Sequence, residues 1–301
     1  MICLTGDLHH QSLNTGNQQH CELSEIEVAV RFLRLLEEAK VKVSFFISGR
    51  AVLEQAEELR PIFDSELVEL GGHNFDCFQP ELLHRVSKKL LRSYNGPAWL
   101  QRRDARRTIA IIRQRSGRRI RVWRNHMYMH GPHTERVLAG EGIALVSDGV
   151  RRKALGPEWV ALQGNRWQRA RRRLDGLLPE ALRSTPSAGG IWSFPINIIP
   201  DHEHIYHAER SREWVAWWQR RYAWSDDYGP DSYEVEAWTE LVLEGLRERE
   251  ESGVISNMII HPITMYLADR FRSFERILSY LSLRQTIHLG ECIPVDSRSP
   301  T

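Results

Sequence analysis

The sequence predicts an α/β fold, a distorted barrel of seven or eight parallel strands with helices packed outside. Short apolar segments typical of buried strands alternate with helical segments along the chain, and such alternation indicates a parallel sheet with right-handed crossovers. Polar residues follow most of the strands, at the ends where a barrel gathers its ligands. Neither a glycine-rich dinucleotide motif nor a phosphate-binding loop motif is present to favour an open nucleotide-binding sheet.

Length and composition are compatible with one large domain over residues 1–301. The chain is 42% hydrophobic and 27% charged, with a net charge of +2, which is ordinary for a globular protein. Residues 151–190 contain Pro157, Pro179, Pro186 and a Gly189-Gly190 pair, so we expect an irregular insertion in the barrel there.

We expect a cytoplasmic protein. No apolar segment approaches the roughly 20 residues that a membrane span requires, and no secretory signal is expected because the first strand begins at residue 2. The four cysteines, Cys3, Cys21, Cys77 and Cys292, form no CxxC pair. This spacing argues against a disulfide framework or a zinc ribbon.

The expected strands are apolar segments bounded by glycine, proline or polar residues. The first runs from Ile2 into Gly6, and the last one is weak. In order, the others cover residues 41–47, 66–70, 120–124, 143–148, 191–199, 254–260 and 285–289.

The helices are predicted from periodic apolar residues and from their start and stop signals. Ser24 and Glu27 form a capping box at the first of them, and the polar residues 11–23 before it are expected to be a functional loop. We expect a further helix after Ser48-Gly49 that continues through Leu59, with Pro61 ending the pattern. Other helices are expected over 80–116 with a break at 95–97, and over 134–140, 209–222, 232–250 and 266–281.

The segment that organises the site is Ile2-Cys-Leu-Thr-Gly-Asp7-Leu-His9-His10. It reads as a strand that delivers a carboxylate and two imidazoles to the barrel mouth. Asp7 could act as a general base or as a metal ligand, and neutral imidazole is the commonest metal ligand. The alternative is that His9 and His10 only bond to the local backbone.

A second group of candidates follows Gly71-Gly72. His73 comes directly after these glycines, and Cys77 follows it at the i, i+4 spacing that places two ligands on one helical face. Asp76 is the other candidate partner of His73. Cys77 could instead be a small buried apolar residue.

Three later strands end in further polar groups. Arg124 ends one strand and is expected to orient a catalytic carboxylate, with Asp148 as its partner or as a substrate contact. His261 ends a very apolar strand and is expected to be a general acid or a ligand. His202 lies in the polar loop segment 201–204 and is a candidate substrate contact.

These strand-end residues resemble the motifs of the polysaccharide deacetylase superfamily, the NodB-homology or carbohydrate esterase family 4 proteins, over roughly residues 2–265. The resemblance places Asp7 at the family's catalytic base and Ile259-Ile260-His261-Pro262 at its acid histidine. His73-Asn-Phe-Asp-Cys77 matches the family's His-Ser/Thr-x-x-His motif, and Arg124-Asn-His126 keeps only the arginine of the third motif.

The resemblance implies a NodB-like barrel and a metal-dependent deacetylase, with two departures. His9 or His10 stands where the family has a metal-binding aspartate, and Cys77 stands in place of its second metal histidine. A His9/His73/Cys77 site would suit zinc, which prefers nitrogen and sulfur ligands. The implied mechanism uses Asp7 as base, His261 as acid and Arg124 as the residue that holds Asp7.

The function expected from this resemblance is removal of an N-acetyl group from a sugar precursor of a surface polysaccharide. The sugar could be free, nucleotide-linked or lipid-linked, and Arg171-Arg172-Arg173 could hold its phosphate. A net charge of only +2 argues against a nucleic-acid partner. The alternatives are a catalytically silent barrel that binds a glycan or a protein, and a hydrolase of a non-sugar C–N bond.

Overall fold

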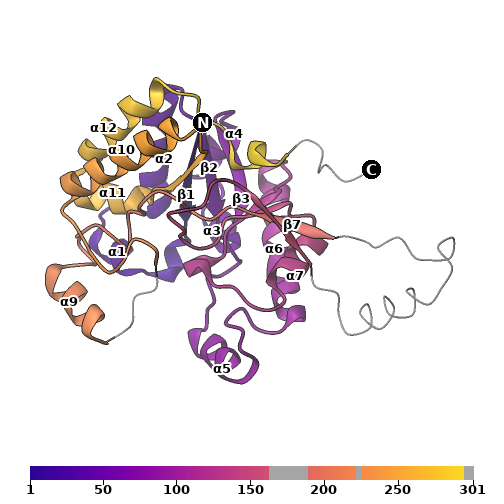
Figure 1. Cartoon of the computed structure of the whole chain (residues 1–301). Coiled ribbons are helices and arrows are strands. Elements are labelled where there is room, and N and C mark those ends of the chain that lie inside the picture. Colours follow the sequence, from indigo (N-terminus) through magenta and orange to yellow (C-terminus); the bar gives the residue numbers. More distant parts are fainter. Residues whose placement is uncertain (163–188, 222–225, 295–301) are drawn as a thin grey trace.

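The computed structural model describes residues 1–162, 189–221 and 226–294. Its centre is an eight-stranded sheet in the order β6-β7-β5-β4-β3-β2-β1-β8 (Figure 1). All neighbouring strands are parallel except β6 and β7, which are antiparallel. The strands are β1 (Ile2–Leu8), β2 (Val43–Ile47), β3 (Val68–Gly72), β4 (Val122–Trp123), β5 (Leu145–Val146), β6 (Glu158–Ala161), β7 (Gly190–Ser193) and β8 (Ser256–Ile259).

Two asparagines connect β8 to the segment that follows β7. The backbone N–H of Asn197 donates to the carbonyl of Asn257 (3.0 Å), and the N–H of Asn257 donates to Oδ1 of Asn197 (2.8 Å). The Asn257 side chain also donates to the carbonyl of Phe194 (2.8 Å). These bonds bring the two ends of the parallel sheet together, so the predicted distorted barrel is confirmed.

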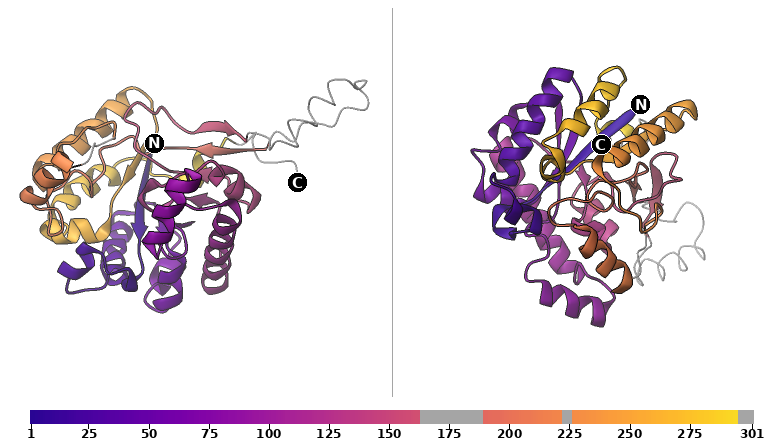
Figure 2. Two further views of the ribbon diagram at one scale, coloured as in Figure 1. Left: turned by 90° about the horizontal axis from the view of Figure 1, so that it is seen from below. Right: turned by 90° about the vertical axis from the view of Figure 1, so that its left-hand side faces the viewer.

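Helices surround this sheet (Figure 2). On one flank α2, α10, α11 and α12 pack side by side, and on the other α3, α6 and α7 do so. The bounds are α1 (Gly16–His20), α2 (Glu25–Ala39), α3 (Gly49–Glu54), α4 (Arg60–Asp64), α5 (Glu81–Leu91), α6 (Ala98–Ser116), α7 (Thr134–Gly140), α9 (Arg212–Arg221), α10 (Val235–Glu251), α11 (Pro262–Asp269) and α12 (Arg272–Ser282).

Several predicted elements differ from the structure. The strand expected over 285–289 is only a single bridge between Ile2 and Thr286, and the eighth strand is instead β6, inside the expected insertion. The helix expected over 266–281 is two helices, because Arg270 and Phe271 have left-handed backbone angles (φ 60° and 72°). The Phe271 ring is buried against Phe32 and Tyr266, which stabilises this break.

The loop regions differ as well. Residues 11–23 contain α1, which Thr15 and Gln18 start with a capping box. The helix expected through Leu59 ends at Glu54, and Pro61 lies in the first turn of α4 rather than ending a helix, where its missing N–H costs nothing.

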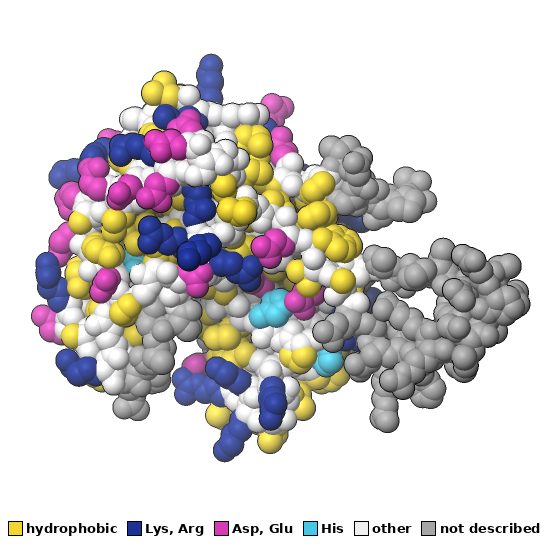
Figure 3. Space-filling view, in the orientation of Figure 1, with side chains coloured by type: hydrophobic (Ala, Val, Ile, Leu, Met, Phe, Trp, Pro, Cys, Tyr) yellow, Lys and Arg dark blue, Asp and Glu magenta, His cyan; other side chains and the backbone are white. Residues whose placement is uncertain are grey.

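The arginines of α6 lie on its solvated face. Arg102 and Arg106 pair with Glu141 at 3.4 Å and 2.8 Å, and basic and acidic side chains are interspersed over the face drawn in Figure 3.

Within the described ranges, no helix combines the length and apolar character needed to cross a bilayer.

Candidate active site

Polar side chains converge on a cavity of about 240 Å³ at the C-terminal ends of the strands. Asp7 comes from β1, and His9, His73, His126 and His261 lie just past β1, β3, β4 and β8, which the parallel sheet brings to one mouth. The residues that line the cavity include Asp7, His9, Glu25, His73, His126, Tyr128, His202, Glu203, Glu209 and His261.

Arg124 holds one oxygen of Asp7. Its Nη1 donates to Asp7 Oδ1 (2.9 Å), while Nη2 donates to Oγ1 of Thr5 and Oγ of Ser147 and Nε donates to the Ser147 carbonyl. The guanidinium is fully buried and lies over the Phe46 ring. This leaves Asp7 Oδ2 as the oxygen that can react, 3.9 Å from Nε2 of His73 and of His261.

The environment keeps Asp7 ionised. Burial alone would raise its pKa, but the positive charge of Arg124, helped by the neighbouring histidines, outweighs it and lowers the pKa to about 2. Asp7 is therefore a carboxylate at neutral pH.

Three imidazole nitrogens meet beside Asp7. His73 Nε2 lies 3.2 Å from His9 Nε2 and 3.3 Å from His126 Nδ1. Together with Cys77 these histidines offer four ligand atoms that all lie within 4.8 Å of one another. Burial lowers the pKa of His73 to about 3 and that of His126 well below its usual value, so both rings present a lone pair.

The outer nitrogens of two of these rings are fixed by bonds away from the cluster. His9 Nδ1 lies 2.8 Å from Glu25 Oε1, and Gln18 donates to the other oxygen of Glu25. His73 Nδ1 donates to the carbonyl of Arg124 (2.9 Å). Both rings thus turn Nε2 inward, as metal-binding histidines do when a carboxylate or carbonyl holds the other nitrogen.

The residues present fit a divalent metal of the zinc type. A tetrahedral zinc ion with Zn–N bonds of 2.0–2.1 Å places neighbouring nitrogens about 3.3 Å apart, which matches the two spacings around His73. The donor set of three nitrogens and one sulfur is also typical of zinc. Burial raises the pKa of Cys77 well above its usual value, so its thiol is protonated in the absence of metal. A metal ion bound there would have to displace this proton.

His261 is held by Asp201. The Asp201 carboxylate accepts from the backbone N–H of His261 (2.6 Å) and from its Nδ1 (2.8 Å). Burial would lower the pKa of His261, but the charge and hydrogen bond of Asp201 raise it to about 10. The ring therefore carries a proton on Nε2, toward Asp7. Two neighbouring groups whose pKa values are shifted in opposite directions, as those of Asp7 and His261 are, are typical of a base and an acid in one site.

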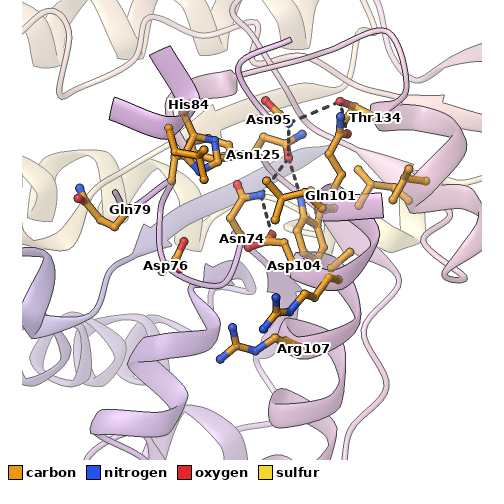
Figure 4. Close-up of a pocket in the computed structure, with 18 residues that line it drawn as sticks. Asn74, Asp76, Gln79, His84, Asn95, Gln101, Asp104, Arg107, Asn125 and Thr134 are labelled. Atoms are coloured by element: carbon orange, nitrogen blue, oxygen red, sulfur yellow. Dashed lines mark hydrogen bonds between the residues drawn. The ribbon is translucent and has the colours of Figure 1, made fainter. Parts of the chain in front are cut away.

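Asn74 connects the strand-end loops that carry His73 and His126. Its Oδ1 accepts from the His126 N–H (2.9 Å), and its Nδ2 donates to Asp104 (3.0 Å), which also accepts from the Phe75 N–H. Figure 4 shows the bond from Asn74 to Asp104 in a second cavity, which Asn95, Gln101, Asn125 and Thr134 also line. Burial raises the pKa of Asp104 to about 6.

Replacing Asn74 with Ala is expected to weaken metal binding by about 10–100-fold, because residues that orient ligands contribute about that much. The dissociation constant is measured by competition with a chromophoric chelator. Asn95→Ala is the control, since Asn95 belongs to the same network but bonds to Asn125, Met129 and Thr134 rather than to a histidine. Equal weakening in both variants would show a general loss of structure.

The cavity brings together most of the residues predicted from the sequence. Asp7, His9, His73, His202 and His261 line it, and Arg124 and Cys77 lie directly behind them. Three other candidates have different surroundings. Asp148 accepts from the backbone and side chain of Asn125, His10 faces Ser48, and Asp76 faces the second cavity.

The prediction that His73 and Cys77 lie on one face of a helix is wrong. Residues 73–77 form no helix, and Asn74, Cys77 and Phe78 have positive φ values. The resulting turn returns Cys77 to His73. Sequence reasoning missed His126 as a candidate metal ligand and Glu25 as the partner of His9. The position of His126 two residues past Arg124, at the end of a strand, was the available signal. Arg171, Arg172 and Arg173 lie outside the described residues.

No family model and no curated protein matches the chain, but solved structures do. A protein assigned as a polysaccharide deacetylase from Mycobacterium smegmatis superposes with a TM-score of 0.60 at 14% identity, covering 96% of this chain and 86% of that one. An allantoinase gives 0.60 at 12% over 96% and 86%. A protein assigned as a polysaccharide deacetylase from Pseudomonas aeruginosa gives 0.59 at 13% over 96% and 87%.

Proposed function

Since the chain has the NodB-like fold of these polysaccharide deacetylase structures, as the sequence predicted, we propose that it is a metal-dependent hydrolase that removes an N-acetyl group from a sugar. One observation carries the proposal. Asp7 Oδ2 lies 3.9 Å from Nε2 of both His73 and His261, so a metal-binding imidazole and a protonated imidazole flank one carboxylate oxygen.

The metal would be held by His9, His73 and His126, with Cys77 as a possible fourth ligand. A divalent ion in such a site lowers the pKa of a bound water and polarises a carbonyl. Asp7 Oδ2 accepts the proton of the attacking water, while Arg124 keeps the carboxylate in place. His261 donates its proton to the nitrogen of the leaving amine. Asp201 stabilises the positive charge of His261 before that transfer.

The proposed substrate is a precursor of a surface polysaccharide in the cytoplasm, either free or linked to a nucleotide or a lipid. The cavity of about 240 Å³ suits a single acetylated sugar unit. A second candidate is hydrolysis of a small non-sugar amide, and one observation favours it: the allantoinase superposes as well as the deacetylase does.

The test is turnover by the zinc-loaded protein. N-acetylated amino sugars, free and nucleotide-linked, are assayed for released acetate, and cyclic ureides are assayed for ring opening. We expect acetate release from at least one sugar, and loss of that activity in His261→Ala. Turnover of the ureides alone would select the second candidate. Turnover of neither class would leave a silent barrel that binds a glycan or a protein, and would contradict the proposal.

A further inference from the structure

A second cluster of possible metal ligands lies in the loop that follows β7. His202, His207 and Glu209 each offer one ligand atom, and these atoms lie within 4.8 Å of one another. His202 and Glu209 line the same cavity as Asp7 and His73. The reaction proposed above uses none of these three residues.

His207 presents a lone pair for which the described residues provide no donor. Its Nδ1 donates to the carbonyl of Ile205 (2.8 Å), so Nε2 carries no proton in the neutral ring. Within the part of the chain that the structure describes, Nε2 is buried with no hydrogen-bond partner, and the residue is only 8% exposed. A buried acceptor without a donor is costly, and a cation bound there would remove the cost.

The other two residues contact groups on other elements, and Glu209 is the more firmly bound of the two. Glu209 Oε2 accepts from the backbone N–H of Asn17 (2.9 Å), and His202 Nδ1 lies 3.5 Å from Thr264 Oγ1. Gly16 leaves the space that Glu209 occupies, because a Cβ at position 16 would lie 2.6 Å from the Glu209 side chain. The chain therefore provides room for this carboxylate beside the cavity.

We propose that His202, His207 and Glu209 bind a second divalent cation of the zinc type, separate from the ion at His9, His73 and His126. Two histidines and one carboxylate are a common ligand set for zinc sites that keep a position open. The open position would face the cavity and take an oxygen ligand from the substrate. This goes beyond the proposed function, which requires one metal ion only.

Two positively charged side chains lie near the cluster, Arg210 and the protonated His261. Arg210 follows Glu209 directly, and its guanidinium lies 5.1 Å from the ring centroid of Trp214. The negative charges of Glu203 and Glu209 stabilise the positive charge of Arg210. His261 is a ring neighbour of both clusters, at 5.4 Å from His202 and 6.4 Å from His9, so the proposed acid would lie beside both ions.

The experiment is a metal count. Protein stripped with a chelator is reloaded with Zn²⁺, freed of excess metal and analysed for zinc in wild type, His207→Ala, His73→Ala and His20→Ala. We expect about two equivalents in wild type, about one in His207→Ala and in His73→Ala, and about two in His20→Ala. His20 is an exposed histidine outside both clusters, so it controls for non-specific binding.

The outcomes separate the two proposals. One equivalent in wild type that His207→Ala retains would overturn the second site and leave the proposed function intact. No zinc in any sample would contradict both. Glu209→Gln keeps the side-chain shape if His207→Ala fails to fold by circular dichroism, and we expect its second equivalent to bind at least about tenfold more weakly. Unchanged affinity in a folded Glu209→Gln would also overturn the inference.

Discussion

Asp7→Asn is expected to lower kcat by about 10²–10⁴-fold, the range that a positioned general base contributes. The substitution also leaves the buried Arg124 cation without a charged partner, so the free energy of unfolding should fall, and kcat is compared on protein shown to be folded. An asparagine oxygen can still accept from Arg124 Nη1, which lies 2.9 Å from Asp7 Oδ1, so the fold and the metal content should remain. The oxygen that is lost is Oδ2, which faces His73 and His261.

Steady-state kinetics on the substrate found by the turnover test measures this effect. Asp64→Asn is the matched control, since Asp64 is an exposed carboxylate in α4 and its replacement should leave kcat unchanged. A kcat within threefold of wild type for Asp7→Asn, with metal content equal, would remove Asp7 from the role of base.

Arg124→Met is expected to lower the free energy of unfolding by about 3–5 kcal/mol. The reason is that it leaves the buried Asp7 carboxylate without its ion-pair partner. Adding Asp7→Asn to this variant should restore part of the loss, because no buried charge then remains unpaired. Chemical denaturation of the four proteins in this cycle gives the coupling energy. Arg34→Met, on the exposed face of α2, should change stability by less than about 0.5 kcal/mol.

The same ion pair gives stability a pH dependence. Because the pKa of Asp7 is lowered from 3.8 to about 2, the pair contributes about 2 kcal/mol above pH 4, and this contribution is lost as the pH falls toward 2. Stability measured from pH 5 to pH 2 should therefore fall less steeply in Arg124→Met than in wild type. Parallel curves, or no coupling in the cycle, would show that Arg124 does not stabilise the Asp7 carboxylate.

The features that the sequence predicted well depend on local patterns. β1, the capping box at Ser24 and the strand ends at His73 and His261 follow from short apolar segments and their boundaries. The gathering of those ends at one mouth follows from the parallel order of the strands. This much of the fold and of the candidate site needs no knowledge of distant contacts.

The features that the sequence did not predict depend on distant contacts. Asn197 and Asn257 close the barrel across about 60 positions of sequence, and β6 pairs with β7 across residues outside the described ranges. His126 enters the cluster because Asn74 accepts from its N–H. The spacing of apolar residues in the sequence does not predict such a side-chain hydrogen bond, so the sequence indicated only that His126 lies in a loop.

We expect the imidazoles past β1, β3 and β4 to bind a divalent metal. Replacing either of two adjacent histidines, His9 or His10, tests this expectation. His9 Nε2 faces His73, whereas His10 Nδ1 faces Ser48. Elemental analysis of zinc-reloaded His9→Ala and His10→Ala should show about one equivalent less than wild type in the first variant and no loss in the second. Equal zinc in wild type and His9→Ala, with both proteins folded, would contradict the account.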